Sequence, residues 1–345
     1  MKRKPSLAAV LVALGTTAVA LTAWTGLAGA SAKKASLSGA GSTFVAPLVS
    51  LWTQHYSGAD INYAAVGSGA GIKSIQARTV DFGASDAPMT PDQFAGCHGC
   101  VQIPWAYAAT SIPYNITGVG YNKLKLTGPI LANIYLGKIT KWNDPRIRKI
   151  NKGVNLPNEA IVPIWRSDGS GTSYNFTDYL SHVSKQFRSQ IGKGTQPAFK
   201  VGVGAKGSSG VAAKLGTTPG GITYVDVAYA YRFHYKIAKI QNRAGKFILP
   251  GVKSLIAVSN SVKKVTRKDN AISVVDPPKS VKNGYPICTF TWIIVPLQTP
   301  KAADLKAFVN WALTKGQTYG HPLLFLRIPK SVRQAGKKTI ARVHT

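Results

Sequence analysis

The chain has 345 residues, of which 45% are hydrophobic and only 16% are charged. That length suffices for one large domain, or for two ordinary ones, with a buried core. The 43 Lys and Arg residues outnumber the 12 Asp and Glu residues and give a formal charge of +31, so most positive charge must lie solvated at the surface. The basic residues are spread along the chain with no zinc-finger or RNP pattern, which argues against a nucleic-acid partner.

The first 32 residues have the three parts of a secretory signal peptide. Basic residues at 2–4 precede an apolar run at 7–21, and a small-x-small cleavage site follows at 30–32, with 28–30 as a second candidate. An uncleaved membrane anchor is the alternative. Since no Cys follows the apolar run, we expect no lipid anchor. The sequence thus predicts a periplasmic or otherwise extracytoplasmic protein, with a formal charge of +28 after cleavage.

From residue 33 onward, short β-rich runs alternate with amphipathic helical segments, which predicts an α/β fold. Three places share one plan, in which a short apolar run leads through a Gly/Ser/Thr loop into a helix. They span residues 37–44, 61–71 and 161–172, and the second helix is expected from about Ile72. Further helices are expected at 130–135 and 301–314, strands at 222–225 and 290–295, and a last helix or a frayed tail from Lys330.

The three cysteines are compatible with a small local bridge. A Cys97–Cys100 disulfide that leaves Cys288 free is the favoured interpretation in an exported protein. Inert thiols are the first alternative and a functional pair the second. Three cysteines cannot make a four-cysteine zinc site, and Val101 stands where haem attachment needs a His.

Motifs of enzymes and nucleotide sites are absent or poorly placed. Residues 202–207 match the dinucleotide fingerprint, with Asp226 downstream, but 208–210 should delay the helix, so we do not expect a nucleotide site. The sequence has no HExxH, GxSxG or Walker motif, and its six His residues show no ligand spacing. We therefore predict no catalytic residues, no metal and no cofactor.

The three Gly/Ser/Thr loops suit an oxyanion. A helix N-terminus exposes unpaired backbone N–H groups and partial positive charge, Gly permits close approach, and Ser and Thr add hydroxyl donors. Each loop alone is explained by ordinary helix capping. Three such loops in one chain, one of them carrying Arg166 with its planar fork of donors, favour binding of a tetrahedral oxyanion.

Ordered sequence runs from about residue 36 to 314 closely resemble the periplasmic phosphate-binding proteins of ABC transporters, the PstS family. The matching runs are GAGSTF at 39–44, GS at 67–68, VDFGASDAP at 80–88, IYLGKITKW at 134–142, RSDGSGTS at 166–173 and GGITY at 220–224. Ser42, the cysteine-bearing segment 91–102, the end of the chain from 321 to 345 and the missing lipid-attachment Cys depart from the family pattern.

The resemblance implies a type II periplasmic-binding-protein fold, with two α/β lobes joined by two crossover hinge strands. Lobe I would comprise 33–107 and 284–345, lobe II 108–283, with the hinge near 107 and 284 and the strand at 290–295 returning the chain to lobe I. The implied protein is a monomer that captures inorganic phosphate between its lobes and delivers it to membrane permease subunits of a phosphate ABC transporter.

The resemblance also implies the ligand contacts, in which one carboxylate stands among many donors. The donors would be Thr43, Phe44, Ser68, Arg166, Ser170, Gly171 and Thr172. Asp86 would be the lone acceptor, able to bind the proton that phosphate keeps near neutral pH and to reject sulfate, which has none. A secreted phosphohydrolase on the same lobes and a basic envelope-binding protein are the alternatives.

Overall fold

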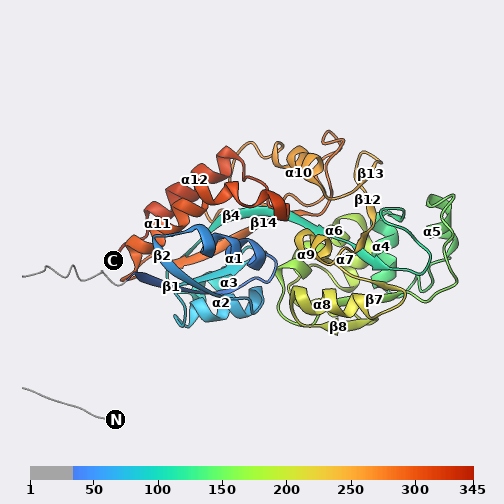
Figure 1. Ribbon diagram of the computed structural model, residues 1–345, viewed down its shortest axis with the longest axis horizontal. Helices are drawn as coiled ribbons and strands as arrows, with labels where there is room; N and C mark the ends of the chain where they lie inside the picture. Colours follow the sequence, from blue (N-terminus) through green and yellow to red (C-terminus); the bar gives the residue numbers. More distant parts are fainter. Residues whose placement is uncertain (1–33) are drawn as a thin grey trace, which may run out of the picture. The chain divides into compact units, whose positions relative to one another are not determined.

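Most strands of the computed structural model, which describes residues 34–345, belong to two sheets (Figure 1). The predicted signal peptide lies outside the described residues. Helices and strands alternate along residues 34–345, which form one unit by their internal contacts and confirm the α/β expectation. Within that range, no helix combines the length and apolar character that crossing a bilayer requires.

The first sheet has six strands in the order β10-β4-β14-β3-β1-β2. Parallel pairing joins β1 to β2 and β3, whereas β14 is antiparallel to β3 and β4, and β10 is antiparallel to β4. The strands are β1 (Ala35–Gly41), β2 (Ala59–Ala64), β3 (Phe82–Ser85), β4 (Cys100–Ser111), β10 (Val225–Asp226) and β14 (Cys288–Pro296). Its helices are α1 (Ala46–His55), α2 (Ser68–Gln76), α3 (Pro91–Gly96), α11 (Ala302–Ala312) and α12 (Lys330–Ala341), with 3-10 turns at Lys315–Thr318 and His321–Leu323.

Strands β4 and β14 form the longest pairing of this sheet, and every residue of both is buried. Their near-continuous apolar character is that expected of strands covered on both faces. The register shifts between Thr291 and Trp292, opposite Pro104 and Trp105, where a proline that lacks an N–H cannot complete the ladder.

The second sheet has five strands in the order β11-β5-β9-β7-β8, and a small third sheet has the order β13-β12-β6. The strands are β5 (Pro113–Asn115), β6 (Lys125–Leu126), β7 (Val162–Arg166), β8 (Val203–Ala205), β9 (Gly221–Ile222), β11 (Lys236–Ile237), β12 (Lys239–Gln241) and β13 (Phe247–Ile248). The helices of this part are α4 (Gly128–Tyr135), α5 (Pro145–Ile150), α6 (Gly171–Val183), α7 (Lys185–Gln190), α8 (Gly207–Gly216), α9 (Val227–Arg232) and α10 (Val252–Ser259).

The chain passes between the two sheets along strand β4. This strand continues without interruption to Ser111, and after Ile112 the chain enters β5 of the second sheet. It returns to the first sheet for β14, which begins at Cys288. The lobe boundaries expected at 107/108 and 283/284 stay a prediction.

Some helix starts differ from the sequence expectations. Helix α2 begins at Ser68 rather than near Ile72, because Gly67 adopts a positive φ of 97° and turns the chain directly into the helix. Helix α8 begins at Gly207, so the delay expected from residues 208–210 is wrong. The tail from Lys330 is a helix, α12, and a bridge between Gln298 and His344 pairs the end of the chain with the segment after β14.

Candidate anion-binding site

Three helices, α1, α2 and α6, begin at loops that lie close together. The backbone N–H of Gly171, first in α6, donates to Ser68 Oγ at the start of α2 over 3.1 Å. The N–H of Gly69 donates to the carbonyl oxygen of Gly169 over 2.8 Å. Glycine is required at 171, because a Cβ there would lie 2.6 Å from the backbone nitrogen of Asp86. The partial positive charge of these helix starts therefore converges on one small region, which suits an anion.

Asp86 follows strand β3 and is almost completely buried within this region. Its Oδ1 accepts a hydrogen bond from the Ser42 hydroxyl, and its Oδ2 accepts one from Ser68 Oγ over 3.4 Å. Burial raises the pKa of Asp86 to about 7, against the opposing effects of the Ser42 hydrogen bond, the Arg166 charge and the Ser68 hydrogen bond. This carboxyl can therefore gain or lose a proton near neutral pH.

Arg166 ends strand β7 and is also buried. Its Nε and Nη2 donate to the two carboxylate oxygens of Asp168, which also accepts from the backbone N–H of Gly207 over 3.0 Å. Burial alone would raise the pKa of Asp168, but the Arg166 guanidinium and the Gly207 N–H hold it below its usual value. This pairing uses Nε and one N–H of Nη2, which leaves both N–H groups of Nη1 and the second N–H of Nη2 for other acceptors.

The first turn of α6 holds a buried hydroxyl that lacks a partner. Ser170 caps the helix, accepting from the N–H of Ser173 over 3.1 Å, and the Gly171 N–H meets Ser68. Thr172 is 1% exposed, yet its Oγ1 has no hydrogen-bond partner among residues 34–345. An unsatisfied buried hydroxyl costs about 1–3 kcal/mol, so its position fits a group that binds an oxygen-rich ligand.

Ser42 and Thr43 occupy the loop before α1. The Ser42 hydroxyl donates to Asp86 and accepts from the N–H groups of Phe44, over 3.0 Å, and Val45, over 3.3 Å. The Thr43 hydroxyl lies 2.9 Å from Ser208 Oγ and accepts from the Ser208 N–H over 3.1 Å, at the start of α8. Both Thr43 and the Phe44 N–H are thus engaged with protein groups.

Among the sequence-predicted residues, the structure brings Ser68, Asp86 and Gly171 into direct hydrogen-bonded contact, and Ser170 and Thr172 adjoin them. Sequence reasoning missed three participants, Ser42, Asp168 and Ser208. Ser42 departs from the family pattern, and its hydroxyl donates a hydrogen bond to Asp86. Asp168 lies inside the run at 166–173, and its spacing of two residues from Arg166 was a signal for the ion pair.

A second buried carboxyl, Asp226, lies near this region. Its Oδ1 caps α9 by accepting from the Tyr229 N–H over 3.2 Å, while Oδ2 has no partner among the described residues. Burial, assisted by the negative charge of Asp86, raises the pKa of Asp226 well above its usual value. Asp226 therefore serves as the N-cap of α9.

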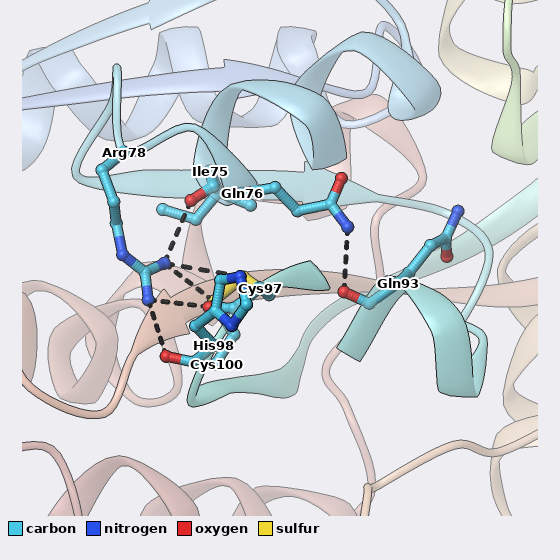
Figure 2. Close-up of a disulfide and its surroundings, with 7 residues drawn as sticks. All are labelled: Ile75, Gln76, Arg78, Gln93, Cys97, His98 and Cys100. Atoms are coloured by element: carbon cyan, nitrogen blue, oxygen red, sulfur yellow. Dashed lines mark hydrogen bonds between the residues drawn. A yellow bond between two sulfur atoms is a disulfide. The ribbon is translucent and has the colours of Figure 1, made fainter. Parts of the chain in front are cut away.

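Cys97 and Cys100 form a disulfide at the start of β4, and Cys288 is an unpaired, buried cysteine. Figure 2 shows the Arg78 guanidinium beside this disulfide, donating to the carbonyl oxygens of Cys97, over 2.8 Å, and His98, over 3.1 Å. The disulfide packs with Ile72 and other apolar residues of α2, in a small cluster separate from the main core. No group of three or more His, Cys, Asp or Glu residues within 34–345 is placed to hold a metal ion.

Comparison with known proteins gives consistent relatives. A family model described as a PBP superfamily domain matches residues 28–315. The phosphate-binding protein PstS of Xylella fastidiosa is 38% identical over 306 residues, covering 87% of this chain and 83% of the relative. The phosphate-binding protein PstS of Pasteurella multocida is 36% identical, covering 86% of this chain and 88% of that relative.

Solved structures share the fold at lower identity. A high-affinity periplasmic phosphate-binding protein solved with phosphate bound has a TM-score of 0.71 at 18% identity, covering 90% of this chain and 99% of that one. A human phosphate-binding apolipoprotein has the same TM-score at 19% identity, covering 88% and 93%. The expected type II periplasmic-binding-protein fold is thereby confirmed, and the chain belongs to the PstS family of phosphate-binding proteins.

Proposed function

We propose that this protein captures inorganic phosphate at the site around Asp86 and delivers it to the membrane permease subunits of an ABC importer. Its curated relatives are named for phosphate binding. The observation that carries the proposal is one buried carboxyl, with a pKa of about 7, among a guanidinium, hydroxyls and helix N-termini. The donors select an oxyanion, and the carboxyl selects among oxyanions.

Selection by Asp86 follows from the position of one proton. Phosphate near neutral pH carries at least one proton, which can lie between a phosphate oxygen and the Asp86 carboxylate. Sulfate carries none, so it faces a repulsive charge unless Asp86 itself is protonated. The site should therefore prefer phosphate most strongly above pH 7, where the carboxyl is ionised in the ligand-free protein.

The proposed ligand contacts are those implied by the family runs, completed by the unpartnered Thr172 hydroxyl and by Nη1 of Arg166. Lobe I, from 33–107 and 284–345, would supply Thr43, Phe44, Ser68 and Asp86. Lobe II, from 108–283, would supply Arg166 and the start of α6. The hydrogen bond from Gly171 to Ser68 links groups of the two proposed lobes, as capture by closure requires.

Isothermal titration at pH 8 tests the proposal, with phosphate and sulfate as paired ligands. We expect tight binding of phosphate by the monomer at one site per chain, and sulfate binding at least about tenfold weaker, since only about a tenth of the Asp86 carboxyls are protonated at pH 8. Comparable affinities for the two anions would overturn the role given to Asp86. We also propose that the protein binds phosphate without catalysis, so release of phosphate from a generic phosphomonoester would contradict this function.

A further inference from the structure

Asn175 lies one helical turn after Gly171 in α6 and is almost completely buried. Its Nδ2 donates to the backbone carbonyl oxygens of Asp86 and Gly171, each over 3.0 Å, and its Oδ1 accepts from the Thr289 hydroxyl over 2.8 Å. Carbonyl oxygens can only accept, so these neighbours fix the orientation of the amide. One neutral side chain therefore contacts the segment of the lone carboxyl, the first turn of α6 and strand β14.

The partners of Asn175 come from both large sheets. Helix α6 follows β7 of the second sheet, whereas Asp86 follows β3 and Thr289 lies in β14, both strands of the first sheet. In the sequence, Asp86 and Thr289 are 89 and 114 positions from Asn175. The amide thus joins the two sides of the molecule that must meet around one anion at the site of Asp86 and Gly171.

The packing of α6 against the first sheet is incomplete beside Asn175. A cavity of about 330 Å³ is lined by residues 88–90, which follow Asp86, by Thr289 of β14 and by Tyr174, Asn175 and Asp178 of α6. A polar space of this size admits water. Hydrogen bonds at its edge can be exchanged for bonds to water when the two sides separate, at little net cost. The contacts of Asn175 are therefore of a kind that can form and break reversibly.

We propose that Asn175 is a positioning residue, which joins α6 to Asp86 and β14 when the protein closes around phosphate. This inference rests on the proposed function. Asn175 contacts the backbone oxygen of Asp86, whereas the hydroxyls of Ser42 and Ser68 contact its carboxyl. Asn175 therefore determines how long the bound anion is held, and the Asp86 carboxyl determines which anion is bound.

A contact that forms only on closure acts on release of the ligand and not on its entry. Phosphate enters before the Asn175 bonds form, so the association rate constant kon does not depend on them. Release requires those bonds to break, so their loss raises the dissociation rate constant koff. The open, ligand-free protein does not contain them, so its Tm does not depend on them.

Asn175→Ala tests the proposal, and Asn151→Ala is a closely matched control. Asn151 is equally buried, and its Nδ2 donates to the carbonyl oxygens of Lys125 and Ile147, each over 2.9 Å. Its Oδ1 accepts from the Lys125 N–H over 2.7 Å, so it joins β6 to the end of α5 and contacts no residue of the proposed phosphate site. Rapid filtration of radiolabelled phosphate, chased with unlabelled phosphate, measures koff, and calorimetry measures Kd, from which kon follows.

We expect Asn175→Ala to raise koff about tenfold or more, because two hydrogen bonds across the closed site are lost. Its kon and the ratio of its sulfate and phosphate Kd values should stay within about threefold of wild type, and its ligand-free Tm should be unchanged. Asn151→Ala should show the reverse, with a lower ligand-free Tm and a koff within about twofold of wild type.

Three outcomes would overturn the inference. They are a koff of Asn175→Ala within about twofold of wild type, a weaker affinity that arises from kon alone, and a ligand-free Tm lowered as far as in Asn151→Ala. Thr289→Val removes the other end of the contact and should raise koff about threefold or more, so it decides the matter if Asn175→Ala does not fold. A wild-type protein that binds no phosphate would contradict the proposed function as well, whereas normal wild-type binding with unaffected variants would contradict this inference alone.

Discussion

Ser42 shows how much of the site depends on one hydroxyl. It donates to Asp86 and accepts from the N–H groups at the start of α1, so it joins the lone carboxyl to a helix N-terminus. The long family run predicts Asp86 as a site residue, but the sequence does not predict the role of Ser42, because a small residue in a Gly-rich loop has many possible roles. Only the folded geometry shows which acceptor a serine meets.

Asp86 should make sulfate binding depend on pH. With a pKa of about 7, the protonated carboxyl that sulfate requires becomes about tenfold rarer with each pH unit above 7. Sulfate affinity should therefore fall about tenfold between pH 7.5 and 8.5. In Asp86→Asn the amide does not titrate, so sulfate affinity should be flat with pH and phosphate preference should shrink. Titration calorimetry across this range checks both, and a pH-independent wild type would contradict the role of the carboxyl.

Thr172 gives a test in which stability and binding move in opposite directions. Thr172→Val removes a buried hydroxyl that lacks a protein partner, so the ligand-free protein should keep or gain thermal stability. Phosphate affinity should fall by about 5–30-fold, because a donor to the ligand is lost. Ser181→Ala, at another buried hydroxyl without a partner, is the matched control and should leave the phosphate Kd unchanged. A Thr172→Val protein with normal affinity would remove Thr172 from the site.

Arg166 should be intolerant even of lysine. Its fork binds Asp168 through Nε and Nη2, and a lysine cannot reproduce that geometry. We expect Arg166→Lys to weaken phosphate binding by about 100-fold or more, in the range measured when a buried charge pair loses one partner. Calorimetry measures the Kd, and a melting curve with saturating phosphate separates weak binding from failure to fold. A Kd within threefold of wild type would exclude Arg166 as a ligand contact.

At the scale of elements, local sequence predicted the helices better than their contacts. Gly, Ser and Thr before an apolar helical pattern indicate a helix start from neighbouring residues alone, which is why the beginnings of α1 and α6 were expected. The exact start of α2 depends on the positive φ of Gly67, and the meeting of Ser208 with Thr43 joins residues 165 positions apart. Such contacts arise only when the sheets are assembled.

The disulfide beside α2 should stabilise the fold without tuning the site. Closing so short a loop removes chain entropy worth about 2 kcal/mol from the unfolded state, and Arg78 adds hydrogen bonds to the same loop (Figure 2). Cys97→Ser with Cys100→Ser should lower the free energy of unfolding by about that amount while changing the phosphate Kd less than twofold. Chemical denaturation and calorimetry measure the two quantities, and a large change in Kd would mean that the loop positions Ser68 through α2.

For the whole molecule, sequence predicted the fold class and family but not the distribution of charge. Ordered motif runs carry the fold because they repeat a known succession of strands, loops and helices. The +31 charge follows from composition alone, but the sequence does not show which segments become neighbours in the fold, such as Ser331 of α12 and Val262.

The few carboxylates also determine how stability should vary with pH. Two of them, Asp86 and Asp226, have raised pKa values in the folded protein. Their contribution to the free energy of unfolding is fully present below about pH 4. It is lost as the pH rises, up to about 7 for Asp86 and to higher pH for Asp226. Asp81, Asp168 and Asp269 have lowered pKa values, since hydrogen bonds from basic partners outweigh burial, and their contribution is lost below pH 4. The ligand-free protein should therefore be most stable between about pH 4 and 5.

Asp226→Asn separates these opposing effects. An asparagine oxygen can still cap α9, but it cannot ionise, so the decline in stability between pH 5 and 8 should become shallower, by at most about 1.4 kcal/mol per pH unit. The loss below pH 4 should persist, because it belongs to the ion-paired carboxylates. Melting curves of wild type and variant from pH 3 to 8 measure both the loss of stability below pH 4 and the decline above pH 5. Parallel curves above pH 5 would show that Asp226 does not hold a proton in the folded protein.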